Sequence, residues 1–439
     1  MLFTNPQLAQ LREQLSGNRD ELRIAVIPVD CPPLAAVRAG SRMFGRSSYF
    51  KTPQHGEVAT LGAAVHLSAA GPNRFSNIEK QVSALTALPA DVRFTVGFSF
   101  NPSGPSSPEW AGFGALDVVL PEVTFIRDED GGRLVVAVAP GVDASLVLDT
   151  LAGLSMWDAP PPPDPGSHTV ESVPSTAEWQ SEVTEAVGAI RGGSFEKVVL
   201  ARSVRVDSQR AADPFDLVYH LAVANPAGYI YAVAVGDAAF VGASPELLLA
   251  QTGTEIRINP LAGSARRGKG DDDATVGNQL LSSGKNLAEH AIVVDDLVDR
   301  LGPLSSRLDY SEKPSLRRMA TVQHLSTDIS ATLLPGVTPC EVLASIHPTP
   351  AVGGMPRAEA LAFIDKAERL DRGWYSGGVG WIDSGGGATI ALALRCALVR
   401  GKTSHLFAGN GIVAASDPGA ELKETRLKFQ PMLDLLAAT

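Results

Sequence analysis

The stretch GAELKETRLK, residues 419–428, predicts a helix with charged side chains on one face. An Asp-Pro pair directly precedes it and is typical of a helix start, because proline loses no hydrogen bond there and an acidic residue suits the positive helix end. Glu421, Glu424 and Lys428 are three and four residues apart, so they line one face. Two carboxylates and an ammonium on one face form either a site for a hard cation and an anion or a solvated surface row. The spacing alone leaves both interpretations open.

The length and composition predict a globular protein. The chain has 439 residues, of which 44% are hydrophobic and 19% charged, values typical of folded proteins. The length exceeds the usual single domain of roughly 100–200 residues, so it allows one large core or two modules. The net charge of −11 argues against a nucleic-acid groove or a basic membrane-binding surface. A small anionic substrate would need local cations to offset this charge.

The cysteines and the apolar segments predict a cytoplasmic protein. Cys31, Cys340 and Cys396 are widely spaced and odd in number, so they indicate neither a disulfide framework nor a zinc site. The first residues lack the basic segment and apolar run of a signal peptide. No apolar stretch reaches the ~18 residues that span a bilayer, and the longest candidate, 388–399, is interrupted by Arg395. We therefore expect no membrane segment.

The first part of the chain predicts mixed α and β structure. Alternating or apolar runs predict strands, and a 3.6-residue apolar spacing predicts one helix. The expected strands are 22–29, 94–100, 123–127 and 133–138, and the expected helix is 75–88. A proline-rich run at 158–166 cannot be a helix or a central strand. It divides the chain into an N-terminal part, 1–165, which we expect to join the same body, and a catalytic part, 166–439.

The second part of the chain alternates hairpins with helices. Ser175 and Glu178 predict a capping box that starts a helix, and Gly192 predicts its end. The expected strands are 197–202, 229–235, 238–241, 247–251, 255–258, 377–381 and 389–398, and a second helix is expected at 286–301. Short hairpins separated by helices favour an α+β fold with antiparallel sheets over a regular βαβ array.

Seven short motifs follow one another after the proline-rich run: KVVLAR (197–202), GASPELLL (242–249), PLAGSARRG (260–268), LAEH (287–290), HPTPA (347–351), LRCA (394–397) and FAGNGIV (407–413). With the terminal helix, this ordered set resembles the chorismate-utilising enzymes. That family includes isochorismate synthases, salicylate synthases, anthranilate synthase large subunits and aminodeoxychorismate synthases. The resemblance covers about residues 170–435 and is weaker before the proline-rich run. Within the family, the isochorismate synthases are the most similar.

The resemblance implies a fold and a reaction. The fold would be the α+β sandwich of anthranilate synthase and aminodeoxychorismate (ADC) synthase. In it, antiparallel sheets pack orthogonally and are flanked by helices. The reaction would add water at C2 of chorismate and expel the C4 hydroxyl. By resemblance, Lys197 is the general base that activates water and Glu246 is the general acid that protonates the leaving hydroxyl. A lysine can be such a base only where burial or nearby cations favour its neutral amine. A glutamic acid needs an apolar setting to stay protonated, and leucines follow Glu246.

The resemblance also implies a magnesium site. Glu289 and Glu424 match the family's Mg²⁺ ligands, and Glu421 matches a carboxylate beside them. Mg²⁺ prefers hard oxygen ligands and keeps several waters, so two carboxylates from two helices suffice. The family often has Asp or Glu three residues before the first ligand, whereas this chain has Asn286. We expect altered metal affinity there, not its loss.

The remaining implied site residues bind the substrate, chorismate. An arginine suits a carboxylate because its planar fork donates two parallel hydrogen bonds. The residues expected to hold the carboxylates, to line the ring pocket or to contact the substrate are Arg395, Lys428, Gly409, Gly411, Gly263, Ser264, His324 and Ala351.

Three positions discriminate within the family by resemblance. Lys197 favours water over ammonia as the nucleophile, Ala262 stands where aminodeoxychorismate synthases carry a nucleophilic lysine, and Ser264 stands where salicylate synthases usually have threonine. Isochorismate synthase is therefore expected, with salicylate synthase and a non-catalytic chorismate-binding protein as alternatives. We expect a monomer without an amidotransferase subunit, acting in a siderophore, salicylate or menaquinone route.

Overall fold

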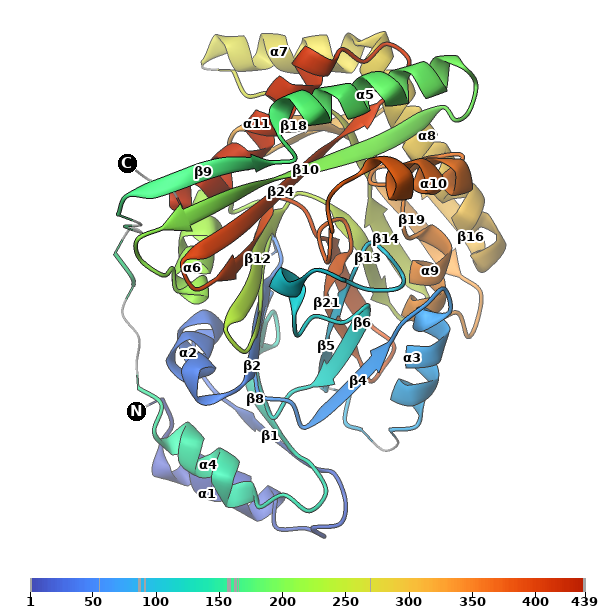
Figure 1. Ribbon diagram of the computed structural model, residues 1–439. Helices are drawn as coiled ribbons and strands as arrows, with labels where there is room; N and C mark the ends of the chain where they lie inside the picture. The colour runs from blue at the N-terminus through green and yellow to red at the C-terminus, as the bar shows by residue number, and fades with distance from the viewer. Residues whose placement is uncertain are drawn as a thin grey trace.

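The structure, a computed structural model, describes residues 2–54, 56–85, 88–90, 92–155, 159–161, 164, 166–268 and 270–436. Within these residues the strands form two large sheets and one small sheet, and every strand pair is antiparallel. Helices flank the sheets on their outer sides (Figure 1). The chain is therefore an α+β protein, as its sequence predicts.

The larger sheet is made by both parts of the chain. In the described residues it has 12 strands, and strands from the first part, β2 among them, pair directly with strands from the second, such as β11. Its members are, in order, β1 (Arg23–Pro28), β8 (Gly131–Val138), β7 (Val123–Asp128), β3 (Glu57–Leu61), β2 (Arg46–Lys51), β11 (Tyr229–Val235), β12 (Ala238–Ser244), β23 (Cys396–Arg400), β24 (Thr403–Ile412), β10 (Lys197–Ser208) and β20 (Gly354–Met355), with β9 (His168–Val173) also on β10.

The second sheet has nine strands in the described residues and the third has three. The second sheet is again shared, because β5 from the first part pairs with β21 from the second. Its order is β16 (Ser305–Tyr310), β19 (Ile329–Leu333), β14 (Glu255–Asn259), β13 (Leu247–Thr252), β22 (Ala388–Leu392), β21 (Gly378–Asp383), β5 (Arg93–Phe98), β6 (Leu116–Leu120) and β4 (Val65–Ala69). The small sheet has the order β15 (Leu261–Arg266), β18 (Val322–Ser326) and β17 (Ser315–Arg318).

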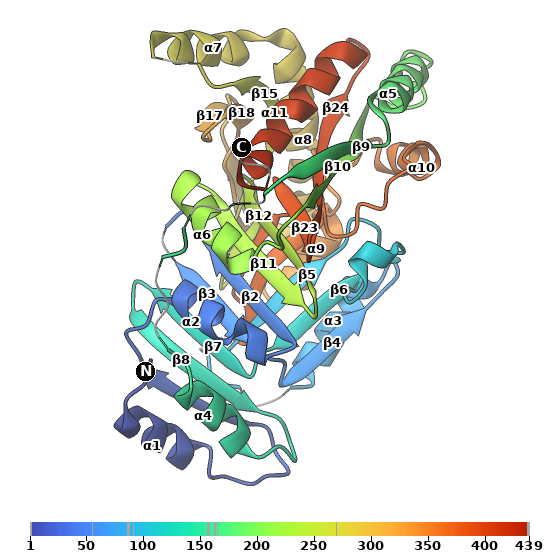
Figure 2. The same ribbon diagram turned by 60° about the vertical axis from the view of Figure 1, so that its left-hand side comes forward.

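The helices belong to two hydrophobic cores. One core takes residues from α3 (Arg74–Ser83), α5 (Thr176–Arg191), α8 (Gly284–Leu301), α9 (Pro339–Ile346) and α10 (Arg357–Ala367). The other takes residues from α1 (Asn5–Gln14), α2 (Pro33–Gly40), α4 (Ala144–Ala152), α6 (Pro214–Ala224) and α11 (Pro418–Leu436). The helix α7 (Asp271–Ser282) lies over the small sheet, and α11 runs beside β24 (Figure 2). These helices pack on the sheets, except that α4 packs chiefly on α1, and burial of the apolar faces supplies most of their stability.

A third core lies between the two large sheets and is rich in aromatic residues. It contains Phe240 and Phe407 from the larger sheet and Val379 from the second sheet. The Trp110 ring lies 5.3 Å from that of Phe240 and 5.6 Å from that of Phe407. Large aromatic side chains each bury a large area and fix the spacing of the layers they join.

Local signals in the sequence placed several helix ends correctly. Ser175 Oγ accepts a hydrogen bond from the Glu178 amide, and the Glu178 carboxylate accepts one from the Ser175 amide at 3.0 Å, so the predicted capping box is present. The helix α11 begins at Pro418, where Asp417 accepts from the Ala420 amide at 2.8 Å. The helix expected at 75–88 is shorter, because α3 ends at Ser83. Pro89 disfavours helical backbone just before it. Two residues of the expected helix, Thr86 and Ala87, lie outside the described residues.

One predicted strand is wrong in a way that matters for function. The run 389–398 is not one strand: β22 ends at Leu392, β23 begins at Cys396, and the two belong to different sheets. Arg395 lies at the crossing with a backbone φ of 50°, in the left-handed region that interrupts a strand. Periodicity could not detect the break because the residues on both sides of it are mostly apolar.

The boundary expected at the proline-rich run falls partly outside the described residues, which omit Asp158, Pro162, Pro163 and Pro165.

Candidate active site

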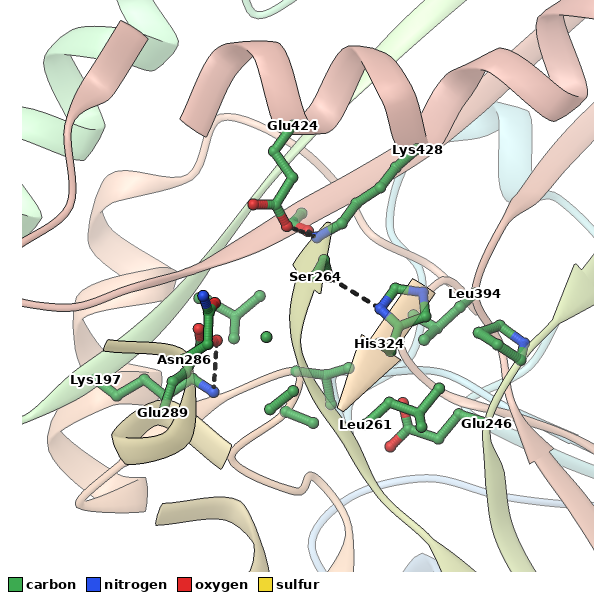
Figure 3. Close-up of a pocket in the computed structure, with 18 of the residues that line it drawn as sticks. Lys197, Glu246, Leu261, Ser264, Asn286, Glu289, His324, Leu394, Glu424 and Lys428 are labelled. Atoms are coloured by element: carbon green, nitrogen blue, oxygen red, sulfur yellow. Dashed lines mark hydrogen bonds and ion pairs between the residues drawn. The ribbon is translucent and has the colours of Figure 1, made fainter. Parts of the chain in front are cut away.

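A pocket lies where the three sheets meet beneath α11. The chain crosses from the larger sheet to the second sheet between β12 and β13, and crosses back between β22 and β23, so the two crossings lie side by side. The β15 and β18 strands close one wall and the start of α8 closes another (Figure 3). All thirteen residues expected from the sequence line this one pocket: Lys197, Glu246, Gly263, Ser264, Glu289, His324, Ala351, Arg395, Gly409, Gly411, Glu421, Glu424 and Lys428.

Lys197 begins β10 and is buried, with 1% of its surface exposed. Its Nζ lies 3.1 Å from Oε1 of Glu289 on α8. Gly411, on the neighbouring strand β24, makes room for this pair. A β-carbon at position 411 would lie 2.2 Å from the Glu289 oxygen and 2.8 Å from Cε of Lys197. A side chain at this position would therefore displace the ends of Glu289 and Lys197 from their present contact.

Glu246 lies at the crossing between β12 and β13, and only 3% of its surface is exposed. Burial raises the pKa of its carboxyl to about 8, although a hydrogen bond from the Leu261 backbone and the charges of Lys197 and Arg395 act in the opposite direction. The carboxyl is therefore protonated at neutral pH. In Figure 3, Glu246 lies on the opposite side of the pocket from the Lys197–Glu289 pair.

The charged face of α11 points into the pocket and not into solvent. Lys428 Nζ lies 2.8 Å from Oε1 of Glu424 (Figure 3). The same Nζ donates to the Gly409 carbonyl at 2.9 Å. Glu421 is buried, and its Oε1 lies 3.1 Å from Nζ of Lys285 on α8. Of the two interpretations that the spacing leaves open, the surface row is therefore excluded.

Three side chains form a hydrogen-bonded chain on another wall. Arg395 Nη2 lies 3.2 Å from Nε2 of His324, and His324 Nδ1 lies 2.9 Å from Oγ of Ser264. A guanidinium can only donate, so Nε2 accepts and Nδ1 carries the proton that it donates to Ser264. Burial, followed by the charges of Arg395 and Lys428, lowers the pKa of His324 well below its usual value, so the ring is neutral. The Ser264 hydroxyl hydrogen is then left to donate elsewhere.

Arg395 is held in an unusual backbone conformation. Its φ of 50° costs a non-glycine residue of order 1 kcal/mol or more. The same crossing allows the Ala243 amide to donate to the Arg395 carbonyl at 3.2 Å. Strain of this kind persists where surrounding packing fixes the backbone, and here it turns the guanidinium toward His324.

The carboxylates of the pocket fit a hard divalent cation in their chemistry. Glu289, Glu421 and Glu424 all present oxygen donors to one cavity, and Mg²⁺ is bound through such donors. Among the described residues, no three His, Cys, Asp or Glu side chains gather closely enough to hold a metal ion. A bound Mg²⁺ would thus keep water or substrate oxygens in its shell. Asn286 also lines the pocket, but its Nδ2 donates to Ser283 Oγ at 2.8 Å.

The sequence did not single out several residues of the pocket. Lys285 is four residues before Glu289 on α8, a helical spacing that could have indicated a shared face. Tyr375 stacks on Phe407 with ring centroids 5.5 Å apart, and Leu394 precedes Arg395 at the crossing. Tyr375 lies in an irregular segment, where no periodicity predicts which way a side chain points.

None of the helices in the described part of the chain combines the length and the apolar character that crossing a bilayer requires.

Comparisons with known proteins identify the family of this chain. The sequence pattern of the chorismate binding enzyme family matches residues 8–437. The chain is 35% identical over 404 residues to the salicylate biosynthesis isochorismate synthase of Pseudomonas aeruginosa, covering 89% of this chain and 84% of that protein. It is 33% identical over 346 residues to an isochorismate synthase of Bacillus subtilis, covering 77% of this chain and 74% of that protein.

Solved structures share the fold. The menaquinone-specific isochorismate synthase from Escherichia coli matches with a TM-score of 0.85 at 25% identity, over 98% of each chain. Anthranilate synthase component I from Streptococcus pneumoniae matches with a TM-score of 0.71 at 21% identity, over 86% of this chain and 92% of that one, which indicates a shared fold. The sandwich expected from the sequence is therefore confirmed, and the chain belongs to the chorismate-binding enzymes, the family that includes the isochorismate synthases.

Proposed function

We propose that this chain is an isochorismate synthase, an isomerase that converts chorismate to isochorismate by adding water at C2 and expelling the C4 hydroxyl. One observation carries the proposal: a buried amine, Lys197, and a buried carboxylic acid, Glu246, lie on opposite walls of one pocket that also holds carboxylates and cations. The relatives named above as isochorismate synthases support the same reaction.

Lys197 would act as the general base and Glu246 as the general acid. Glu246 enters the reaction protonated because its pKa is raised to about 8, so it can deliver a proton to the departing hydroxyl. Lys197 would take a proton from the attacking water. Nζ of Lys197 lies 3.1 Å from Oε1 of Glu289, so the proposed base and a proposed metal ligand are in contact. To accept that proton, Lys197 would have to enter the reaction as the neutral amine.

Mg²⁺ would be held by Glu289 and Glu424, with Glu421 beside them. When bound, the ion would neutralise the substrate's ring carboxylate and offset the negative background of the protein. Each of the three carboxylates pairs with a lysine, at 3.1 Å for Lys197, 2.8 Å for Lys428 and 3.1 Å for Lys285. A cation shared by these carboxylates would leave the lysines more positive charge to offer an anionic substrate.

The anionic groups of chorismate would be held by cations and by backbone. Arg395 and Lys428 are two of the cations that line the pocket. Ser264 would donate to the substrate, since its hydroxyl already accepts from His324. The backbone at Gly409 and Gly411 and the small residues Gly263 and Ala351 leave room for the ring and its carboxylates.

We further propose a cytoplasmic protein that acts as a monomer, without an amidotransferase subunit. The three cysteines are buried and unpaired, as in a reducing compartment. The assigned residues all come from one chain, so a second copy is not needed to complete the pocket.

Incubation of the protein with chorismate and Mg²⁺, followed by chromatography of the products, tests the proposal. Isochorismate as the sole product is expected. Salicylate with pyruvate would instead identify a salicylate synthase, and an ammonia-dependent product would identify an aminating enzyme. Absence of any product, with chorismate still bound, would identify a non-catalytic binding protein.

A further inference from the structure

Asn410 is a buried polar residue directly behind the pocket. It lies on β24 between Gly409 and Gly411, two residues that line the pocket, and 1% of its surface is exposed. Burial of an amide is unfavourable unless its donors and acceptor are all engaged. The partners of this amide therefore indicate what it does.

Both ends of the Asn410 amide bind charged groups of the site. Its Oδ1 accepts from Lys428 Nζ at 2.7 Å. Its Nδ2 donates to the Glu421 carboxylate oxygen Oε2 at 3.0 Å and to the Glu421 carbonyl at 2.8 Å. An ammonium can only donate and a carboxylate can only accept, so these partners fix the orientation of the amide. Neither aspartate nor alanine could make both contacts.

We propose that Asn410 is a positioning residue that holds Lys428 and Glu421 at a fixed separation, and so ties the anion-binding side of the pocket to its metal-binding side. The inference rests on the proposed function, which gives Lys428 and Glu421 those two roles. Asn410 touches neither substrate nor metal itself and acts only through these neighbours.

The neighbouring contacts explain why one amide has this influence. Oε1 of Glu421 pairs with Lys285, which is 41% exposed at its side chain and so has freedom to move. Oε2 is held by Asn410, which is anchored within β24. Without the Asn410 amide, the Glu421 carboxylate keeps only its pair with the exposed Lys285. Lys428 likewise loses one of its three partners. Loss of a group that orients a metal-side ligand typically costs 10–100-fold in metal affinity or activity.

A purely structural role is the competing explanation. The hydrogen bond from Asn410 Nδ2 to the Glu421 carbonyl connects β24 to α11 and does not depend on the Glu421 side chain. Such fastening would affect stability alone. A variant of the Glu421 side chain separates the two roles, because it leaves this backbone bond intact.

The experiment compares Asn410→Ala with Asn225→Ala. Asn225 is also a buried asparagine, but its amide donates to a backbone carbonyl, that of Leu221, at 3.1 Å. Calorimetry measures the affinity of each protein for Mg²⁺ alone, steady-state kinetics gives KM and kcat for chorismate, and thermal melting gives the Tm. For Asn410→Ala we expect about tenfold weaker Mg²⁺ binding and about tenfold higher KM. Asn225→Ala should change only the Tm.

A double-mutant cycle with Glu421→Gln completes the test. If Asn410 acts through the Glu421 carboxylate, Asn410→Ala should weaken Mg²⁺ binding by no more than about twofold in the Glu421→Gln background. Mg²⁺ and chorismate affinities of Asn410→Ala that match those of the wild type would overturn the inference, as would full additivity in the cycle. A wild-type protein that makes no isochorismate would instead refute the proposed function, while the binding measurements still decide the role of Asn410.

Discussion

Lys197 and Glu289 form a buried ion pair, with 3.1 Å between Nζ and Oε1, on one wall of the pocket. They come from β10 and α8, elements that are far apart in the sequence. Lys197 is the proposed base and Glu289 a proposed metal ligand. A change in either partner therefore alters the protonation chemistry and the cation chemistry of the site together.

Replacement of Lys197 by alanine should abolish turnover and spare chorismate binding. The change removes the proposed base, whereas Arg395 and Lys428 remain to hold the carboxylates. Loss of a general base typically costs 10²–10⁴-fold in rate, so we expect a fall in kcat of roughly that size. Kinetics and calorimetry with chorismate measure the two effects. Lys402→Ala, at an exposed turn, is the matched control. Turnover at the wild-type rate would rule out the role of Lys197.

Glu289→Gln should weaken Mg²⁺ binding and make activity low or insensitive to magnesium. The amide keeps the size of the side chain but loses the negative charge that a hard cation requires. It also leaves Lys197 buried without its carboxylate. A magnesium titration of activity, paired with calorimetry, is the measurement, and Glu312→Gln on the surface serves as control. An unchanged titration curve would remove Glu289 from the metal site.

Gly411→Ala should disable the enzyme although it adds a single methyl group. That methyl would lie 2.2 Å from Oε1 of Glu289 and 2.8 Å from Cε of Lys197, so the pair must separate. We expect a fall in kcat of at least about tenfold, since small displacements of catalytic groups can cost 10²-fold. Gly188→Ala on α5 has nothing within 4 Å of the added carbon. That control should retain activity and gain up to about 1 kcal/mol of stability. Equal activities of the two variants would contradict the packing argument.

The pH profile of kcat/KM should fall as pH rises through about 8. Glu246 must be protonated to act as an acid, and its pKa is raised to about 8 by burial. Activity that depends on this proton is therefore present below pH 8 and lost above it. Glu246→Gln should lose most activity at every pH. A wild-type profile that stays level well above pH 8 would show that ionisation of Glu246 does not limit the reaction.

The raised pKa of Glu246 also predicts how the free energy of unfolding depends on pH. In the unfolded chain Glu246 ionises near pH 4.5, whereas in the folded protein it stays protonated up to about pH 8. The folded state binds the extra proton, so the free energy of unfolding should fall as pH rises from about 4.5 to 8. Denaturant titrations at several pH values should show that this slope is smaller in Glu246→Gln. Parallel slopes for the two proteins would contradict the assignment.

Local signals predicted the elements that depend on neighbouring residues. The capping box of Ser175 and Glu178 and the start of α11 are set by side chains within a few positions, so the sequence contains the whole interaction. The face shared by Glu421, Glu424 and Lys428 follows from helical spacing in the same way. The association of distant motifs in one pocket was predicted from family resemblance, because spacing within one element does not report contacts between elements.

The features that escaped prediction depend on tertiary structure. The break at Arg395 occurs where the chain changes sheets, and both flanks carry a strand pattern. Two of the three carboxylate–lysine pairs join different elements, Lys197 with Glu289 and Lys285 with Glu421, and no local pattern indicates them. Lys285 acquires its role only because Glu421 packs against the start of α8.

The most direct test of the central claim follows oxygen through the reaction. Chorismate and Mg²⁺ are supplied in water enriched in ¹⁸O, and early isochorismate is analysed by mass spectrometry with fragmentation to locate the label. If Lys197 activates water and Glu246 expels the C4 hydroxyl, every isochorismate molecule should carry solvent oxygen at C2. Isochorismate without solvent oxygen would contradict the account, because its hydroxyl would then have moved within the substrate and no water would have been added.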